Sequence, residues 1–140
     1  MKRISGLKLL DEREGVGGRP AQKGDRVTYN VKMFLNQGDE VPLSDIQAKQ
    51  LPKDMVRNEG GATFIDHTIV LGRRQAIAGV EHALTDMRVG GYRKVRVSPH
   101  LAYRDKGVAD FIPPDAVLIC EIWLRDIVDL SPVESLPGVT

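Results

Sequence analysis

Residues 71–127 constrain the fold most strongly, because one short helix and two strands follow each other there with clear stops between them. Apolar side chains recur at the spacing of a single buried helical face, at Ala76, Val80, Ala83, Leu84 and Met87. Two glycines, Gly90 and Gly91, then allow the backbone to turn with φ > 0. The pattern predicts one helix over residues 75–87.

Two strands are predicted after this helix. Val95 and Val97 alternate with basic residues, which is typical of a half-buried strand whose basic cluster, residues 92–96, faces solvent. The prolines of residues 113–114 interrupt any hydrogen-bonded ladder, and residues 117–127 then form a long apolar strand. Alternation predicts an inward face on this last strand and places Trp123 on the opposite face; the inward residues are Leu118, Cys120, Ile122 and Leu124.

The amino-terminal half adds further strands. Residues 4–14 indicate a first strand, and residues 27–33 alternate apolar and polar side chains with a period of two. Residues 36–39 carry turn chemistry, so residues 40–43 are expected to form the return strand of a hairpin. Together the segments predict an α+β fold in which a curved antiparallel β-sheet wraps around one short α-helix.

Composition excludes several classes of function. The net charge of +1 gives no reason to expect a nucleic acid or an anionic membrane as partner. The single cysteine excludes an intrachain disulfide and fits a reducing compartment, and the three histidines lack the spacing of a metal site. No long apolar segment marks a secretory signal or a membrane span, so we expect a cytoplasmic protein.

The ordered motifs of residues 71–118, with the VTYNV segment upstream, resemble the FKBP-type peptidyl-prolyl cis-trans isomerases over roughly residues 5–128. The chain looks like a divergent, bacterial-like, single-domain member. The positions that match the family pattern are Leu71, Gly72, Ile77, Gly79, Met87, Gly90, Pro99, Ala102, Tyr103, Ile112, Pro113, Pro114, Ala116 and Leu118.

The resemblance implies an isomerase that binds X-Pro segments in an apolar pocket, speeds rotation of the amide and assists protein folding without a cofactor or metal. The implied catalytic residues are Tyr103, whose hydroxyl contacts the substrate, Ile77, whose backbone N–H binds a carbonyl, and Tyr29, an aromatic wall. The implied substrate-binding residues are Val41, Ala76, Val80, Phe111, Ile112 and Cys120. Proline-containing peptides or unfolded proteins are the expected partners.

The pocket departs from the family pattern at several positions. Val80 replaces the tryptophan of the pocket floor, Cys120 replaces a phenylalanine of the last strand, and His67 aligns with another phenylalanine. The family's Phe-Asp pair aligns with Val41-Pro42, so the pocket carboxylate is missing. Because each aromatic ring buries about 150–250 Å², we expect only weak macrolide binding. A non-catalytic or weakly catalytic peptide-binding module is therefore the alternative function.

The domain organisation follows from the same comparison. Residues 1–128 are expected to form one FKBP-like domain, with an insertion at about residues 44–67 that holds a short helix near residues 45–50. Residues 63–71 are expected to return to strand structure before the helix. Residues 129–140 are expected to form a loosely ordered tail, whose Leu136-Pro137 dipeptide is a hypothetical occupant of the pocket.

Overall fold

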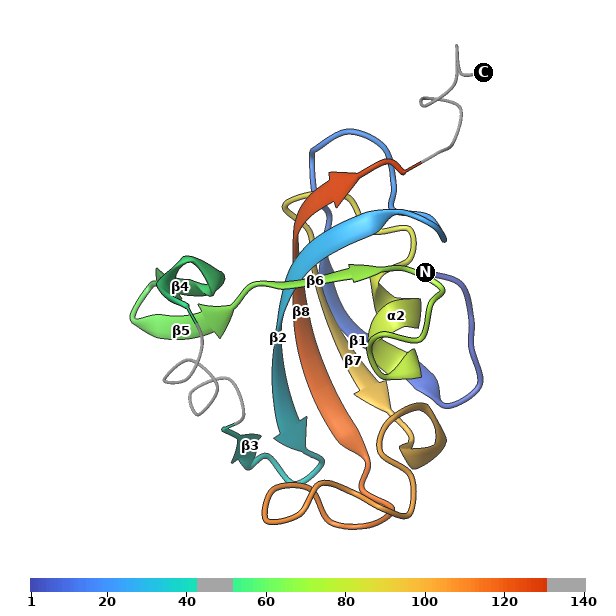
Figure 1. The fold of residues 1–140 in the computed structure, drawn as a ribbon. Helices are drawn as coiled ribbons and strands as arrows, with labels where there is room; N and C mark the ends of the chain where they lie inside the picture. Colours follow the sequence, from blue (N-terminus) through green and yellow to red (C-terminus); the bar gives the residue numbers. More distant parts are fainter. Residues whose placement is uncertain (43–51, 131–140) are drawn as a thin grey trace.

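A curled antiparallel sheet wraps around one short helix, as Figure 1 shows, which confirms the predicted α+β fold. The computed structural model describes residues 1–42 and 52–130. Its strands are β1 Leu7–Arg13, β2 Arg26–Leu35, β3 Glu40–Val41, β4 Val56–Glu59, β5 Ala62–Ile65, β6 His67–Val70, β7 Tyr92–Val97 and β8 Leu118–Val128. The helix is α2, Ala78–Leu84, and two 3₁₀ turns, η1 Lys53–Met55 and η2 Pro99–Leu101, complete the described elements.

The main sheet has the order β1-β7-β8-β2-β3, and all of its pairings are antiparallel. The other edge of β2 is shared, because β6 pairs with residues 26–29 and β3 pairs with residues 33–34. A register shift between Thr28 and Tyr29 interrupts the long pairing of β2 with β8. Such a shift bends the strand and helps the sheet to curl around the helix.

The core lies between the concave face of the sheet and α2. The four predicted inward residues of β8, Leu118, Cys120, Ile122 and Leu124, are fully buried, as the alternation predicts. The helix buries Val80, Ala83 and Leu84 against them. Trp123 points to the opposite, convex face, where the rings of Phe64 and Tyr92 pack at centroid distances of 5.0 and 5.3 Å.

The helix is shorter than predicted, spanning seven residues instead of residues 75–87. Ile77 is extended, with ψ of 147°, and Thr85 ends the helix with ψ of 132°. The Glu81 carboxylate binds the backbone N–H groups of Gln75 and Ala76, which holds this segment in a loop. Helical periodicity continued beyond both ends because the flanking apolar residues also face the core, although they lie in loops.

Several strand boundaries also differ from the prediction. Residues 4–6 precede β1 as a turn that contains Gly6 at φ 87°, and the return strand β3 has two residues. Residues 63–71 form parts of two strands that are separated at Asp66, because β5 pairs with β4 whereas β6 pairs with β2. Two apolar stretches flank Asp66 and His67 in the sequence, and their separate pairing partners divide the segment into two strands.

The described part of the insertion is structured. Strands β4 and β5 form a hairpin whose turn, Gly60-Gly61, has φ of 58° and 81°. Two consecutive residues with positive φ are typical of the turn type that suits the twist of a two-residue hairpin. We call residues 52–65 the arm; Figure 1 shows it beside β2, across the sheet from α2. The short helix expected near residues 45–50, and the tail from residue 131 onward, lie outside the described residues.

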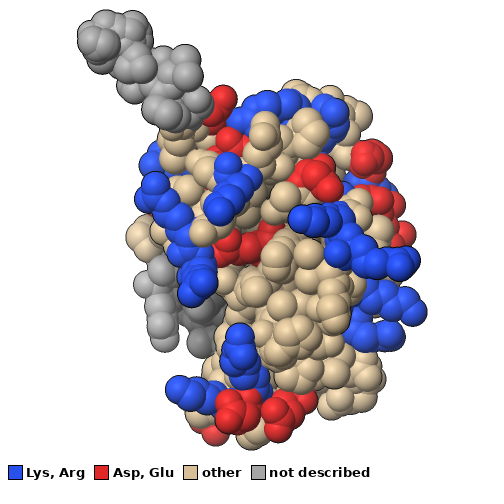
Figure 2. All heavy atoms as spheres, turned by 90° about the vertical axis from the view of Figure 1, so that its right-hand side faces the viewer, with Lys and Arg blue, Asp and Glu red and all other residues tan. Residues whose placement is uncertain are grey.

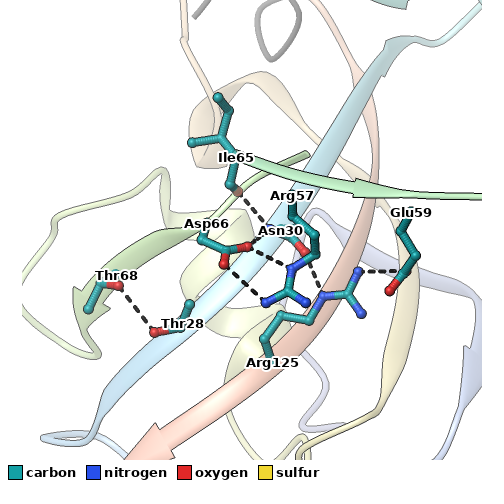
Figure 3. A network of polar contacts seen from close by, with 8 residues as sticks. All are labelled: Thr28, Asn30, Arg57, Glu59, Ile65, Asp66, Thr68 and Arg125. Atoms are coloured by element: carbon teal, nitrogen blue, oxygen red, sulfur yellow. Dashed lines mark hydrogen bonds and ion pairs between the residues drawn. The ribbon is translucent and has the colours of Figure 1, made fainter. Parts of the chain in front are cut away.

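A polar network binds the arm to the sheet (Figure 3). The fully buried Asn30 of β2 donates to the carbonyl of Ile65 and to the carboxylate of Asp66, both at 2.7 Å. Its own carbonyl accepts a hydrogen bond from Arg125, while Arg57 of β4 makes two hydrogen bonds to Asp66 at 3.0 Å. Burial alone would raise the pKa of Asp66, but the hydrogen bonds from Arg57 and Asn30 outweigh it and lower the pKa.

The basic cluster of residues 92–96 is not entirely a solvated face. Arg93 is 4% exposed, and its guanidinium donates to the carbonyls of Ala83 and Thr85. It also pairs with the carboxylates of Glu12 and Asp86. The Arg93 side chain therefore provides hydrogen-bond donors for carbonyl groups at the carboxyl end of α2 and joins this end to β1 and β7. No helix among the described residues is long and apolar enough to cross a membrane.

Candidate functional site

A cavity of about 200 Å³ opens at the beginning of α2, between the helix, strand β2 and the loop after η2. Most of the predicted site residues line this cavity. The residues that line it are Tyr29, Val31, Met33, Val41, His67, Gln75, Ala76, Ile77, Val80 and Tyr103. The structure thus brings together the three predicted catalytic residues with the predicted binding residues Val41, Ala76 and Val80.

Tyr29 forms the sheet side of the cavity. Tyr29 is 5% exposed, and its ring lies against the ring of His67 with the ring centroids 5.4 Å apart. Burial raises the pKa of the Tyr29 phenol strongly, and the nearby Glu81, Tyr103 and Cys120 raise it further. The phenol therefore stays protonated and acts as a neutral wall and O–H donor.

Tyr103 forms the opposite wall and follows η2. The carbonyl of Tyr103 accepts hydrogen bonds from the backbone of Lys106 and Gly107, which fixes the segment as a tight turn. Gly107 has φ of 60°, and a Cβ atom there would lie 2.2 Å from the carbonyl oxygen of Ile112, so only glycine fits. Burial, and then the neighbouring Cys120, raises the pKa of Tyr103, so its hydroxyl also remains a donor.

Ile77 supplies a backbone donor at the cavity. Its carbonyl accepts hydrogen bonds from Val80 and Glu81, but its own N–H has no acceptor among the described residues. The preceding N–H groups are occupied by Glu81, whose carboxylate accepts from Gly72, Gln75 and Ala76 at 2.8, 2.8 and 3.2 Å. Glu81 therefore shapes the loop and leaves the Ile77 N–H available to a ligand carbonyl.

The remaining predicted residues do not line the cavity. Cys120 is fully buried in the core, and burial raises the pKa of its thiol to about 12, so it is an inert small side chain. Ile112 is 4% exposed and belongs to the core, while Phe111 is half-buried against it. The hydrogen-bonded bridge between Val108 and Ile112 closes the loop after Tyr103. Phe111, Ile112 and Cys120 therefore belong to the packing of the core and not to the lining of the cavity.

Sequence reasoning missed several contributors to the site. Val31 and Met33 line the cavity because they share a face of β2 with Tyr29, and the period-two alternation could have identified them. Gln75 lines it too, and its side-chain oxygen accepts from the backbone of Val70 at 2.7 Å. Nothing in the sequence marks Gln75 or Glu81, because their roles depend on how the loop folds back.

The chemistry that the cavity offers is binding and orientation. Apolar side chains and two neutral phenols surround one backbone N–H, and burial lowers the pKa of His67, the one imidazole in the wall. No cluster of potential metal ligands occurs among residues 1–42 and 52–130. The arrangement can hold a small apolar ring and bind one or two carbonyl oxygens. Among the described residues that line the cavity, no hydroxyl or thiol is hydrogen-bonded to a neighbouring base, as a nucleophilic mechanism would require.

The fold and site define a class of protein in which a curved antiparallel sheet holds one central helix and a largely apolar cavity opens at the start of that helix. Comparison with known families identifies the particular class. The sequence profile of the family described as FKBP-type peptidyl-prolyl cis-trans isomerase matches residues 17–125. The chain belongs to this family, which confirms the predicted family and, with it, the predicted class of enzyme.

Individual relatives agree with this assignment. FK506-binding protein 1A of Neurospora crassa is 29% identical over 124 residues, which cover 89% of this chain and 90% of the relative. FK506-binding protein 2 of Candida glabrata is 36% identical over 103 residues, covering 63% of this chain and 75% of the relative. FK506-binding protein 4 of Chaetomium thermophilum is 31% identical over 127 residues, covering 91% of this chain but 22% of the relative.

Proposed function

We propose that this protein isomerises X-Pro peptide bonds in the cavity formed by β2, the start of α2 and the loop after η2. The prolyl ring rests on Val80, with Tyr29 and Tyr103 on either side. The carbonyl next to the ring accepts a hydrogen bond from the Ile77 N–H. The observation that supports this best is that the residues implied by the family pattern surround one small apolar cavity.

The physical basis is the polarity of the amide. Rotation about a peptide bond meets a barrier of about 18–20 kcal/mol because resonance holds the amide planar and charge-separated. The twisted amide is less polar, so an apolar cavity disfavours the planar ground state more than the transition state. No covalent bond breaks, which is why a cavity without a nucleophile suffices.

The named groups divide the work between orientation and environment. The Ile77 N–H and the Tyr103 O–H bind carbonyl oxygens that flank the proline and fix the chain on both sides of the rotating bond. Tyr29, Val41, Ala76 and Val80 exclude water. Phe111, Ile112 and Cys120 contribute to the packing of the core.

Two-dimensional NMR exchange on a short Leu-Pro peptide tests this proposal without a coupling protease. The protein is expected to accelerate cis-trans exchange at catalytic concentrations, above the slow uncatalysed rate of tens of seconds or longer. Exchange no faster than in buffer would refute the catalytic proposal for this chain.

A second candidate function is a peptide-binding module with little or no turnover. The small residues Val80 and Pro42 favour it, because they replace an aromatic floor and a carboxylate of the family pattern. This function predicts that proline-containing peptides shift the NMR signals of Tyr29 and Tyr103 without faster exchange. Absence of both shifts and acceleration would exclude the binding module as well.

The proposed clients are proline-containing peptides and unfolded protein segments. Weak binding of macrolides such as FK506 is proposed from the names of the relatives and from the small floor of the cavity. The proposed compartment is the cytoplasm, where a single buried thiol such as Cys120 remains reduced. Residues 1–128 are proposed as the functional domain.

A further inference from the structure

A second hollow adjoins the cavity at the start of α2, and two arginines line it. It has a volume of about 520 Å³ and lies along α2, η2 and the loop before the helix. Its basic side chains are Arg74, His82, His100 and Arg104. Figure 2 faces the side of the molecule on which α2 lies, where Lys and Arg atoms, together with some Asp and Glu atoms, border a broad uncharged surface.

The hollow and the cavity share their walls. Ala76 lines both; the next residue, Ile77, lines the cavity, and Ala78 lines the hollow. The same alternation occurs after η2, where Tyr103 faces the cavity and Arg104 faces the hollow. The hollow therefore lies within reach of the residues that would flank a proline held between Ile77 and Tyr103.

The charge of the hollow is available to a ligand. Arg74 and Arg104 are exposed, and neither pairs with a carboxylate among the described residues. The one carboxylate of the described residues that lines the hollow, Glu81, already accepts hydrogen bonds from three backbone N–H groups. The imidazoles of His82 and His100 add further donors.

The backbone at both arginines is unusual. Arg74 has φ of 57° and Arg104 has φ of 53°, in the left-handed region that non-glycine residues seldom adopt. Backbone strain of this kind gathers at ligand-binding sites and is retained where it positions a side chain. Two such arginines on opposite segments, 72–76 and 102–104, border one hollow.

We infer that the hollow recognises acidic residues near the proline of the substrate, so that the enzyme prefers X-Pro segments flanked by Asp, Glu or another anionic side chain. Guanidinium groups bind carboxylates through paired hydrogen bonds and through charge. The inference rests on the proposed isomerase function, because it places the proline in the neighbouring cavity.

Matched peptides with a Leu-Pro core test the inference by NMR exchange. In one series the two residues before the Leu-Pro core are both Glu, both Gln or both Lys. In a second series the two residues after the core are varied in the same way. At low salt the better Glu peptide is expected to show kcat/KM about five-fold above Gln and to exceed Lys by more, since each exposed pair contributes modestly. The preference is expected to shrink in 0.5 M NaCl because salt screens exposed charges.

Variants assign the preference to the two arginines. Arg74→Gln with Arg104→Gln is expected to bring the Glu-to-Gln ratio to about one, whereas the corresponding double Lys variant retains part of the preference. Arg26→Gln with Arg96→Gln removes the same formal charge from exposed strand positions and is expected to leave the ratio unchanged.

The outcomes separate this inference from the proposed function. Acceleration of the Gln peptide with equal kcat/KM for the Glu and Lys peptides would overturn the acidic preference and leave the isomerase proposal standing. If no peptide is accelerated, the isomerase proposal fails, and titration of the same peptides then decides the inference. Tighter binding of Glu than Lys supports it, and equal binding overturns it.

Discussion

The two faces of the sheet differ in how their side chains are used. On the concave face, the described side chains that line the cavity around Val80 carry no carboxylate or basic chain of Lys or Arg and leave space at the start of α2. On the convex face, Asn30, Asp66 and Arg125 fill the junction between the arm and β2 with hydrogen bonds (Figure 3). The buried polar groups at this junction therefore maintain structure, whereas the proposed chemistry needs an apolar space with few fixed donors.

The largest expected effect is loss of stability on the convex face. Asn30→Ala would leave the Ile65 carbonyl and the partners Asp66 and Arg125 without their shared amide. We expect the free energy of unfolding to fall by about 3 kcal/mol, because buried polar groups lose their hydrogen bonds. Urea titration measures the change.

Thr28→Ala provides the control for this network, since Thr28 shares only one exposed hydrogen bond with Thr68, at 3.1 Å. It should change stability by less than about 1 kcal/mol. Exchange rates on a Leu-Pro peptide should remain at the wild-type level in folded Asn30→Ala protein. A large loss of activity in the folded variant would show that the two faces are not independent.

The next largest effect is expected from a larger side chain at the floor of the cavity. Val80→Trp restores an aromatic ring where the family pattern has one, and the added apolar contact is expected to tighten FK506 binding by about thirty-fold, or about 2 kcal/mol. Calorimetric titration measures the affinity. Leu10→Trp adds the same ring at an exposed position of β1 and should have no effect; unchanged affinity in folded Val80→Trp protein would contradict the proposed floor.

A smaller effect is expected from the hydroxyl of Tyr103. Tyr103→Phe keeps the ring but removes a donor to the substrate, so kcat/KM should fall by about ten-fold, or about 1.4 kcal/mol. Tyr92→Phe is the matched control, because the Tyr92 hydroxyl binds Glu121 at 2.5 Å, away from the cavity. Equal loss in both variants would mean that Tyr103 has no specific role.

The smallest effect concerns pH. Burial lowers the pKa of His67, although Asp66 opposes the shift. The unfolded chain, with a His pKa of about 6.5, then binds more protons than the folded protein just below that pH, so stability decreases as the pH falls through this window. His67→Phe should reduce this decrease in urea titrations at pH 7 and below, whereas His82→Gln, at an exposed position of α2, should retain it.

The sequence predicted the concave face far better than the convex one. Alternation on β8 identified the four buried residues because that signal is local, and the family resemblance selected Tyr29, Ile77 and Tyr103, which the structure brings to one cavity. The burial of Arg93 was not predicted: its partners come from β1 and α2, so no local pattern records them.

The sequence did not predict where the helix and some strands end, for a related reason. The helix periodicity extends to Ala76 and Met87, which face the core from loops, so burial alone could not show where the hydrogen-bonded helix ends. Glu81, which folds back on the preceding loop, sets its beginning. The division of residues 63–71 at Asp66 likewise depends on two different pairing partners.

The most direct test of the account is the location of a bound proline. Intermolecular NOEs can be recorded between the ring protons of a Leu-Pro peptide and the side chains of the protein. The account predicts NOEs to Tyr29, Val80 and Tyr103 on the concave face. NOEs that join the prolyl ring only to Phe64 and Trp123, on the convex face, would contradict it.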